Sequence, residues 1–220
     1  MSRSSSSTTP PGCVDLVLLM SSLQRDANRV RITNWQSIAL SYTEFVEYFK
    51  QAGHLSRHHL IIGASFTYSW MPTMLDFRSA RFDLGVAILE RARSGEEVTT
   101  DDLSELSMIV NNSMVGASKL LHFVAPERFP IWDSRVATYL GATVKCGMAG
   151  VSQYQAYAAC CRSLAARSEA EGITGAMAAH IGQLITTMRA IELLMYYAAL
   201  ERFTYHALSN AQALTTEVRP

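Results

Sequence analysis

Apolar residues recur every three or four positions along almost the whole chain, which is the spacing that amphipathic α-helices produce. In "RSARFDLGVAILERARSG", Phe82, Val86 and Leu89 share one face, and Gly95 stands where a helix can end. No series of alternating apolar and polar runs predicts a β-sheet, and no internal repeat is visible. Because 49% of the residues are hydrophobic, the helices can bury a sizeable core. The sequence therefore predicts an all-α fold, built as a compact multi-helix domain.

The other helices are expected where this spacing is bounded by caps or helix-breaking residues. The expected segments are residues 13–28, 44–53, 59–71, 101–112, 117–124, 134–140, 153–172 and 175–209. Ser41 stands three residues before Glu44, a pattern typical of a capping box at a helix start. The last segment is interpreted as one long helix whose apolar stripe contains Ile181, Leu184, Ile185, Met188, Ile191 and Met195.

Composition sets limits on location and cofactors. Residues 1–12, rich in Ser, Thr and Pro, predict a disordered tail ahead of a single domain at 13–220. No segment is long and apolar enough to predict a membrane span, so a cytoplasmic location is expected. The four cysteines lack the CxxC spacing of zinc sites, and neither a metal nor another cofactor is expected. With 19 basic and 19 acidic residues the formal net charge is zero, which neither requires nor excludes nucleic acid as a partner.

One segment carries the functional signal. "LSMIVNNSMVGASKLLHF", residues 106–123, predicts a helix, a tight turn around 113–116 and a second helix. "APERFPIWDSRVATYL", residues 125–140, then places Asp133 after two prolines and directly before a short helix. Aspartate is a preferred N-cap, so Asp133 is expected to cap that helix, whether or not it also reacts.

This order of elements resembles the helix-hairpin-helix DNA glycosylase superfamily, including its 8-oxoguanine DNA glycosylase and endonuclease III-like branches. "MVG" at 114–116 is similar to the second half of the family's hairpin, and "FPIWDSRV" at 129–136 to its aspartate segment. The resemblance covers roughly residues 106–140. It implies that Asp133 is the catalytic aspartate and that Lys119 lies near the position of the nucleophilic lysine of some members.

The implied chemistry is excision of a modified base from DNA by cleavage of its N-glycosidic bond. A carboxylate near C1′ stabilises the positive charge that develops on the sugar and can deprotonate the nucleophile. Lys119 stands three residues after Gly116 rather than the family's two, which turns it by about 100° on a helix. We therefore expect water, not Lys119, to attack C1′.

The resemblance also assigns binding roles. The residues expected to contact nucleic acid are Gly116, Ser118, Lys119 and Arg135. The pocket for a flipped base is expected to be lined by the aromatic residues Phe66, Tyr68, Trp70 and Trp132.

Two alternatives remain open at this level. Ser113 and Met114 stand where the family has its hairpin proline and first glycine, which favours a catalytically inactive module of the same fold that binds nucleic acid or protein. The second alternative is an ordinary helical bundle, with Asp133 only a cap, Lys119 a surface residue and His122 a core residue. An enzyme needs Asp133 at an open cleft, whereas a bundle closes it off by packing. The sequence fixes neither the base nor the oligomeric state.

Overall fold

The computed structural model describes residues 15–32 and 36–216, and within these residues the chain forms ten α-helices. In chain order these are α1 (Leu16–Ala27), α2 (Gln36–Lys50), α3 (Arg57–Ser69), α4 (Phe82–Ser94), α5 (Thr100–Ile109), α6 (Met114–Val124), α7 (Ser134–Tyr139), α8 (Gly147–Ala165), α9 (Glu169–Ile181) and α10 (Thr187–Thr216). The expected all-α fold is confirmed. The predicted tail at 1–12 lies outside the described residues. In the part of the chain described, no helix combines the length and apolar composition that crossing a bilayer requires.

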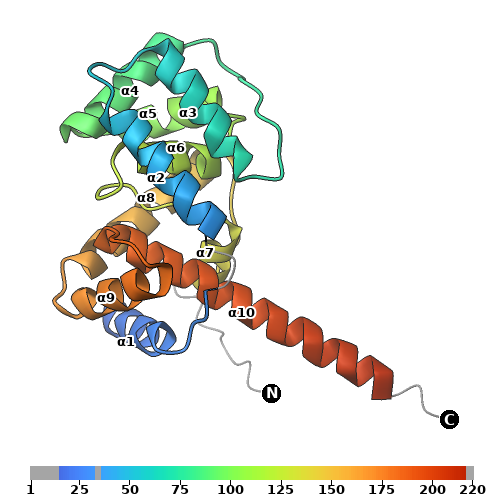
Figure 1. Ribbon diagram of the computed structural model, residues 1–220. Coiled ribbons are helices and arrows are strands. Elements are labelled where there is room, and N and C mark those ends of the chain that lie inside the picture. The colour runs from blue at the N-terminus through green and yellow to red at the C-terminus, as the bar shows by residue number, and fades with distance from the viewer. Residues whose placement is uncertain (1–14, 33–35, 217–220) are drawn as a thin grey trace, which may run out of the picture.

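The helices form two groups with α7 and α8 between them (Figure 1). In the first group α2, α3, α4 and α5 all pack against α6, and all residues of α6 except Val115 are buried. In the second group α1 and α9 pack against α10. Helix α8 contacts α5 and α6 on one side and α1 and α10 on the other, while α7 packs against α10. The two groups are therefore joined around α6, α8 and α10.

Several helix ends follow from local sequence chemistry. Gly95 ends α4 in the left-handed conformation with φ 89°, as its position predicted. Thr99 caps α5, and the side chain of Asp102 bonds back to the Thr99 amide at 3.0 Å, which completes a capping box. The start of α2 differs from the prediction. The helix already begins at Gln36, and the Ser41 hydroxyl donates to the Ile38 carbonyl inside it at 3.2 Å.

The predicted continuous helix over 175–209 is wrong. Helix α9 ends at Gly182, which is left-handed with φ 72°, and α10 begins only at Thr187. Ile181 and Met188 are buried, but Leu184 in the connection is 95% exposed. Spacing alone could not separate one helix from two, because the apolar residues before and after the break still fall at intervals that suit one helix. Gly182 was the available signal for the break.

The turn before α6 also lies elsewhere than expected. It runs through Val110–Ser113, and Asn111 and Asn112 carry its positive φ angles of 59° and 51°. Asparagine tolerates this region better than other residues with side chains, so no glycine is needed. Residues 114–116 form the first turn of α6, with Ser113 as N-cap accepting from the Gly116 amide at 3.2 Å.

Gly116 has a packing role. A Cβ at this position would lie 2.6 Å from the Tyr68 hydroxyl, which donates to the Val110 carbonyl at 3.1 Å. Tyr68 is buried and therefore cannot swing away freely. Gly116 is thus the residue that lets Tyr68 of α3 reach the end of α5 across the surface of α6.

Replacing Gly116 should therefore be costly. We expect Gly116→Ala to lower the free energy of unfolding by about 1–3 kcal/mol, because overpacking forces buried groups apart. Gly172→Ala is the matched control, since Gly172 is exposed in α9 and has open space at its Cβ position. It should be neutral or stabilise by up to about 1 kcal/mol. Urea unfolding of the two variants checks this, and equal effects would contradict the packing role.

Candidate functional site

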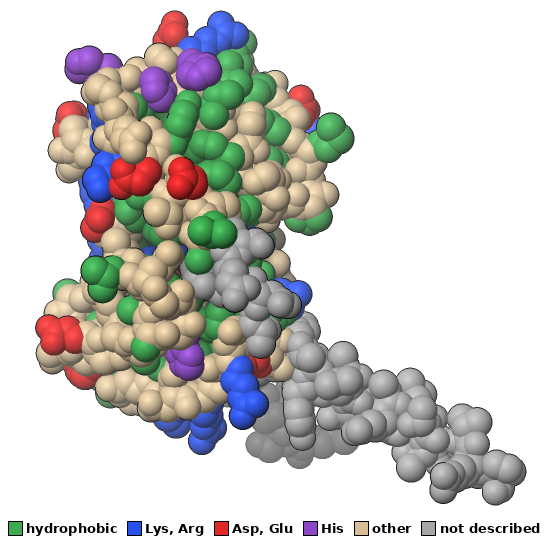
Figure 2. All heavy atoms as spheres, in the orientation of Figure 1, with side chains coloured by type: hydrophobic (Ala, Val, Ile, Leu, Met, Phe, Trp, Pro, Cys, Tyr) green, Lys and Arg blue, Asp and Glu red, His purple; other side chains and the backbone are tan. Residues whose placement is uncertain are grey.

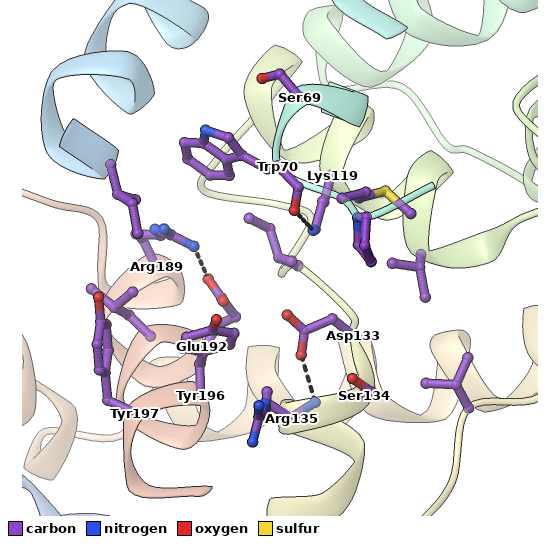
Figure 3. Close-up of a pocket in the computed structure, with 17 residues that line it drawn as sticks. Ser69, Trp70, Lys119, Asp133, Ser134, Arg135, Arg189, Glu192, Tyr196 and Tyr197 are labelled. Carbon is purple, nitrogen blue, oxygen red and sulfur yellow. Dashed lines mark hydrogen bonds and ion pairs between the residues drawn. The ribbon is translucent and has the colours of Figure 1, made fainter. Parts of the chain in front are cut away.

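A pocket of about 690 Å³ opens between the two helix groups. Its volume lies in the range of sites that bind a small molecule or a single base. Figure 3 shows that its polar side chains come from separate elements and converge on one space. The lining residues are Ile38, Ser69, Trp70, Met71, Pro72, Val115, Lys119, Ile131, Asp133, Ser134, Arg135, Val144, Arg189, Glu192, Leu193, Tyr196 and Tyr197.

Asp133 is both a helix cap and a pocket residue. Its Oδ1 accepts hydrogen bonds from the amides of Arg135 at 2.9 Å and Val136 at 3.0 Å, at the N-terminus of α7. Its Oδ2 has no hydrogen bond to any described residue, and Figure 3 shows the carboxylate pointing toward the centre of the pocket. One oxygen therefore orients the group while the other is available to a ligand.

The backbone that leads to Asp133 is held from two sides. The Ser118 hydroxyl of α6 accepts from the Trp132 amide at 3.0 Å. The Tyr157 hydroxyl of α8 donates to the Ile131 carbonyl at 3.0 Å. The Trp132 ring is buried next to the Tyr157 ring, with centroids 4.8 Å apart. These contacts fix the position of Asp133 before any ligand arrives.

Lys119 reaches the same pocket from α6. It is only 7% exposed, and its Nζ donates to the Trp70 carbonyl at 3.4 Å. Burial lowers the pKa of Lys119, while the carboxylates of Asp133 and Glu192 act in the opposite direction. The surface-lysine alternative is therefore wrong. The extra residue between Gly116 and Lys119 does not turn Lys119 out of the pocket that Asp133 lines. Gly116 is not in the turn but in the first turn of α6, so its spacing from Lys119 does not set the direction of the lysine side chain.

The opposite wall carries an ion pair that the sequence analysis missed. Arg189 and Glu192 of α10 are 3% and 2% exposed, and they form a salt bridge. Burial raises the pKa of Glu192 to about 7, although Arg189 opposes the shift. The available signal was two opposite charges three residues apart inside the otherwise apolar run "MRAIELLM".

Behind this pair a histidine is sealed into the core. His122 Nδ1 lies 2.7 Å from the Phe129 carbonyl, which can only accept, so Nδ1 carries the proton. Its Nε2 accepts from the Tyr42 hydroxyl at 3.0 Å. Complete burial, together with the nearby Arg189, lowers the pKa of His122 to about 3, so the ring is neutral. The expectation of a satisfied core histidine is confirmed.

The residues expected to contact nucleic acid divide into two sets. Lys119 and Arg135 line the pocket. Gly116 and Ser118 are buried, and their amide and hydroxyl groups already bond to Ser113 and Trp132. The prediction that Gly116 and Ser118 contact nucleic acid is therefore wrong.

Of the four aromatic residues expected to line a base pocket, only Trp70 lines the pocket between the helix groups. Phe66 stacks on Phe45 in the core with ring centroids 4.2 Å apart, and Tyr68 packs on Gly116. Trp132 is buried beneath the pocket and does not line it. Helical geometry explains Tyr68, because residues two positions apart on a helix point about 200° away from each other. Phe66 shares a face with Trp70 but lies one turn earlier, where it packs against Phe45 and Phe123.

Comparison of the chain with protein-family models, curated proteins and solved structures found no match. The geometry of the pocket is therefore the basis for any assignment of function.

The Tyr42–His122 bond can be tested against a built-in control. Tyr42→Phe leaves His122 Nε2 buried without a donor and should lower the free energy of unfolding by about 1–3 kcal/mol. The Tyr48 hydroxyl is buried and has no partner among the described residues, so Tyr48→Phe should be neutral or stabilising. Thermal or chemical unfolding at pH 7 measures both. An equal loss in the two variants would contradict this account of the His122 network.

Proposed function

We propose that the protein is a DNA N-glycosylase that draws a modified base into the pocket and cleaves its bond to the sugar. One observation carries the proposal: a preorganised carboxylate with a free oxygen, Asp133, shares a pocket with a desolvated amine, Lys119. The pocket has a volume of about 690 Å³ and is bordered by the aromatic residues Trp70, Tyr196 and Tyr197. The ordinary bundle, in which packing closes off Asp133, is not supported by this geometry.

The reaction assigns a role to each group. Cleavage of the C1′–N bond leaves positive charge on the sugar, which the Asp133 carboxylate stabilises. The electron pair of that bond passes to the departing base, which takes up the proton that Asp133 receives from the Lys119 amine. The Lys119 amine forms the new C1′–N bond and transfers its proton to Asp133, and opening of the sugar ring then gives the imine.

Burial of Lys119 favours this amine route over the water route expected from the sequence. An amine attacks only when neutral, and desolvation lowers the pKa of Lys119 and so raises the neutral fraction. Lys119 and Asp133 both line the pocket, which supports attack by the amine on a sugar bound there.

A second candidate is an inactive module of the same fold that binds nucleic acid. The Gly116 amide is bonded to Ser113 and the Asn111 amide to the Asp76 carbonyl, so two donors near the turn are not available to a phosphate. On the face drawn in Figure 2, Lys and Arg side chains lie among acidic and uncharged ones. These features favour a low affinity for DNA. The Asp133→Asn variant distinguishes the inactive module from the enzyme.

Asp133→Asn separates capping from chemistry. Asparagine caps a helix nearly as well as aspartate, so the free energy of unfolding should change by less than about 1 kcal/mol. Base release from oligonucleotides that carry a panel of modified bases should fall by about a hundredfold or more. Full base release by the Asn variant would rule out Asp133 as the catalytic group. Binding of DNA by both forms without any base release would favour the inactive module.

The nucleophile is identified by borohydride trapping during turnover. The chain has three lysines, Lys50, Lys119 and Lys145, so each can be replaced in turn by Gln. The wild type, Lys50→Gln and Lys145→Gln should give a covalent protein–DNA adduct, and Lys119→Gln should give none. Base release that persists in Lys119→Gln without any adduct would restore the water route.

A further inference from the structure

The pocket holds a second carboxylate that the proposed chemistry does not use. Glu192 belongs to α10, whereas Asp133 precedes α7, and Figure 3 shows the two carboxylates approaching the same space from different elements. Glu192 Oε2 accepts from Arg189, while Oε1 has no hydrogen bond within the described part of the chain. Like Asp133, Glu192 therefore has one oxygen fixed by the protein and one available to a ligand.

A row of buried groups holds this carboxylate in place. The Arg189 guanidinium lies 4.7 Å from the centroid of the Tyr42 ring, and the Tyr42 hydroxyl bonds to His122. A buried ion pair is weak as a source of stability, because apolar residues of similar size often stabilise a core as well or better. The position of the pair at the pocket wall points instead to recognition of a ligand.

The chemistry of Glu192 limits what it can recognise. An ionised carboxylate accepts hydrogen bonds and donates none, so it matches two adjacent N–H donors. Of the natural bases, guanine presents such an edge, formed by N1–H and the exocyclic 2-amino group. Adenine and cytosine place a ring acceptor beside their amino group, and the imide edge of thymine or uracil carries carbonyl oxygens on both sides of its N–H. These acceptors would repel the carboxylate.

We propose that Glu192, positioned by Arg189, is the residue that selects the base, and that it does so by accepting hydrogen bonds from the N1–H and 2-amino groups of a guanine-type edge. The inference rests on the proposed function for its biological setting. It concerns selection by the 2-amino group, independent of how the rest of the base is modified. Trp70, Tyr196 and Tyr197 border the same space and offer apolar ring surface to the base.

Guanosine and inosine test this directly, because they differ only in the 2-amino group. Binding of each nucleoside to the full-length protein is measured by calorimetry or NMR titration at pH 8. The wild type should bind guanosine about tenfold more tightly than inosine, which corresponds to about 1.4 kcal/mol. In Glu192→Gln this ratio should fall to about one to two. Glu105→Gln is the matched control, since Glu105 pairs with Arg81 outside the pocket, and it should keep the wild-type ratio.

Ionisation of Glu192 gives a second readout. Its pKa of about 7 is raised by burial and by Asp133, and opposed by Arg189 and Lys119. Protonation replaces an acceptor by an O–H donor, so the wild-type preference for guanosine should fall as the pH is lowered from 8 to 6. The small ratio of Glu192→Gln should stay constant over this range.

The outcomes distinguish recognition from catalysis. A wild type that binds the two nucleosides equally, or binds neither, overturns the inference, as does an unchanged ratio in Glu192→Gln. If Glu192→Gln does not fold, Glu192→Asp keeps the charge but withdraws it by one methylene, and an unchanged ratio in that variant also overturns the inference.

Excision is scored separately, on duplexes that carry 8-oxoguanine or 8-oxohypoxanthine, which again differ only in the 2-amino group. Discrimination between the nucleosides without release of any base would refute the proposed glycosylase and leave Glu192 as the recognition residue. Release of both bases at equal rates by the wild type would support the glycosylase and overturn the role of Glu192.

Discussion

The hydrogen bonds between α6 and the segment 129–132 fix the geometry on which the pocket depends. This segment has no regular secondary structure, so its backbone groups must be satisfied by side chains. Ser118 and His122 lie four residues apart on one face of α6 and bond to Trp132 and Phe129. Helix α6 is the most buried helix of its group, so these bonds attach the segment to the core. Asp133 follows directly at the end of the segment and is held in position with it. The same helix carries Lys119, so both reactive groups take their positions from one element.

The pocket wall combines buried charges of both signs. Lys119, Asp133, Arg189 and Glu192 all line it. Burial is the largest influence on the pKa of Lys119, which falls, and on the pKa of Glu192, which rises. The two shifts have opposite signs but one cause, and they bring an amine and a carboxyl group toward neutrality within the same space. Such an arrangement is typical of sites where protons are exchanged and is unusual where charge serves only solubility.

The sequence was most informative where local chemistry decides the structure. The helix end at Gly95 and the cap at Asp133 depend on a few neighbouring residues and were predicted. The Thr99 and Asp102 capping box has the same local origin but was not predicted. The errors arose where tertiary contacts decide. Gly182 could have ended a helix or sat within one, and its neighbours fit both cases. Phe66 and Trp70 lie four residues apart and both contact Phe45 and Phe123, but only Trp70, at the end of α3, also lines the pocket. Arg189 and Glu192 lie far in sequence from Asp133, so no local pattern could join them.

The contact between Lys119 and Trp70 ties the basicity of the amine to the end of a helix. Trp70 is the C-cap of α3, and its carbonyl belongs to the end of the helix where unpaired carbonyls accumulate negative partial charge. An ammonium group donates a stronger hydrogen bond to this carbonyl than a neutral amine does. The end of α3 therefore favours the charged form of Lys119, in the same direction as the carboxylates of Asp133 and Glu192. A ligand that separates Lys119 from this carbonyl would weaken the preference for the charged form, so binding in the pocket and protonation of the lysine are thermodynamically linked.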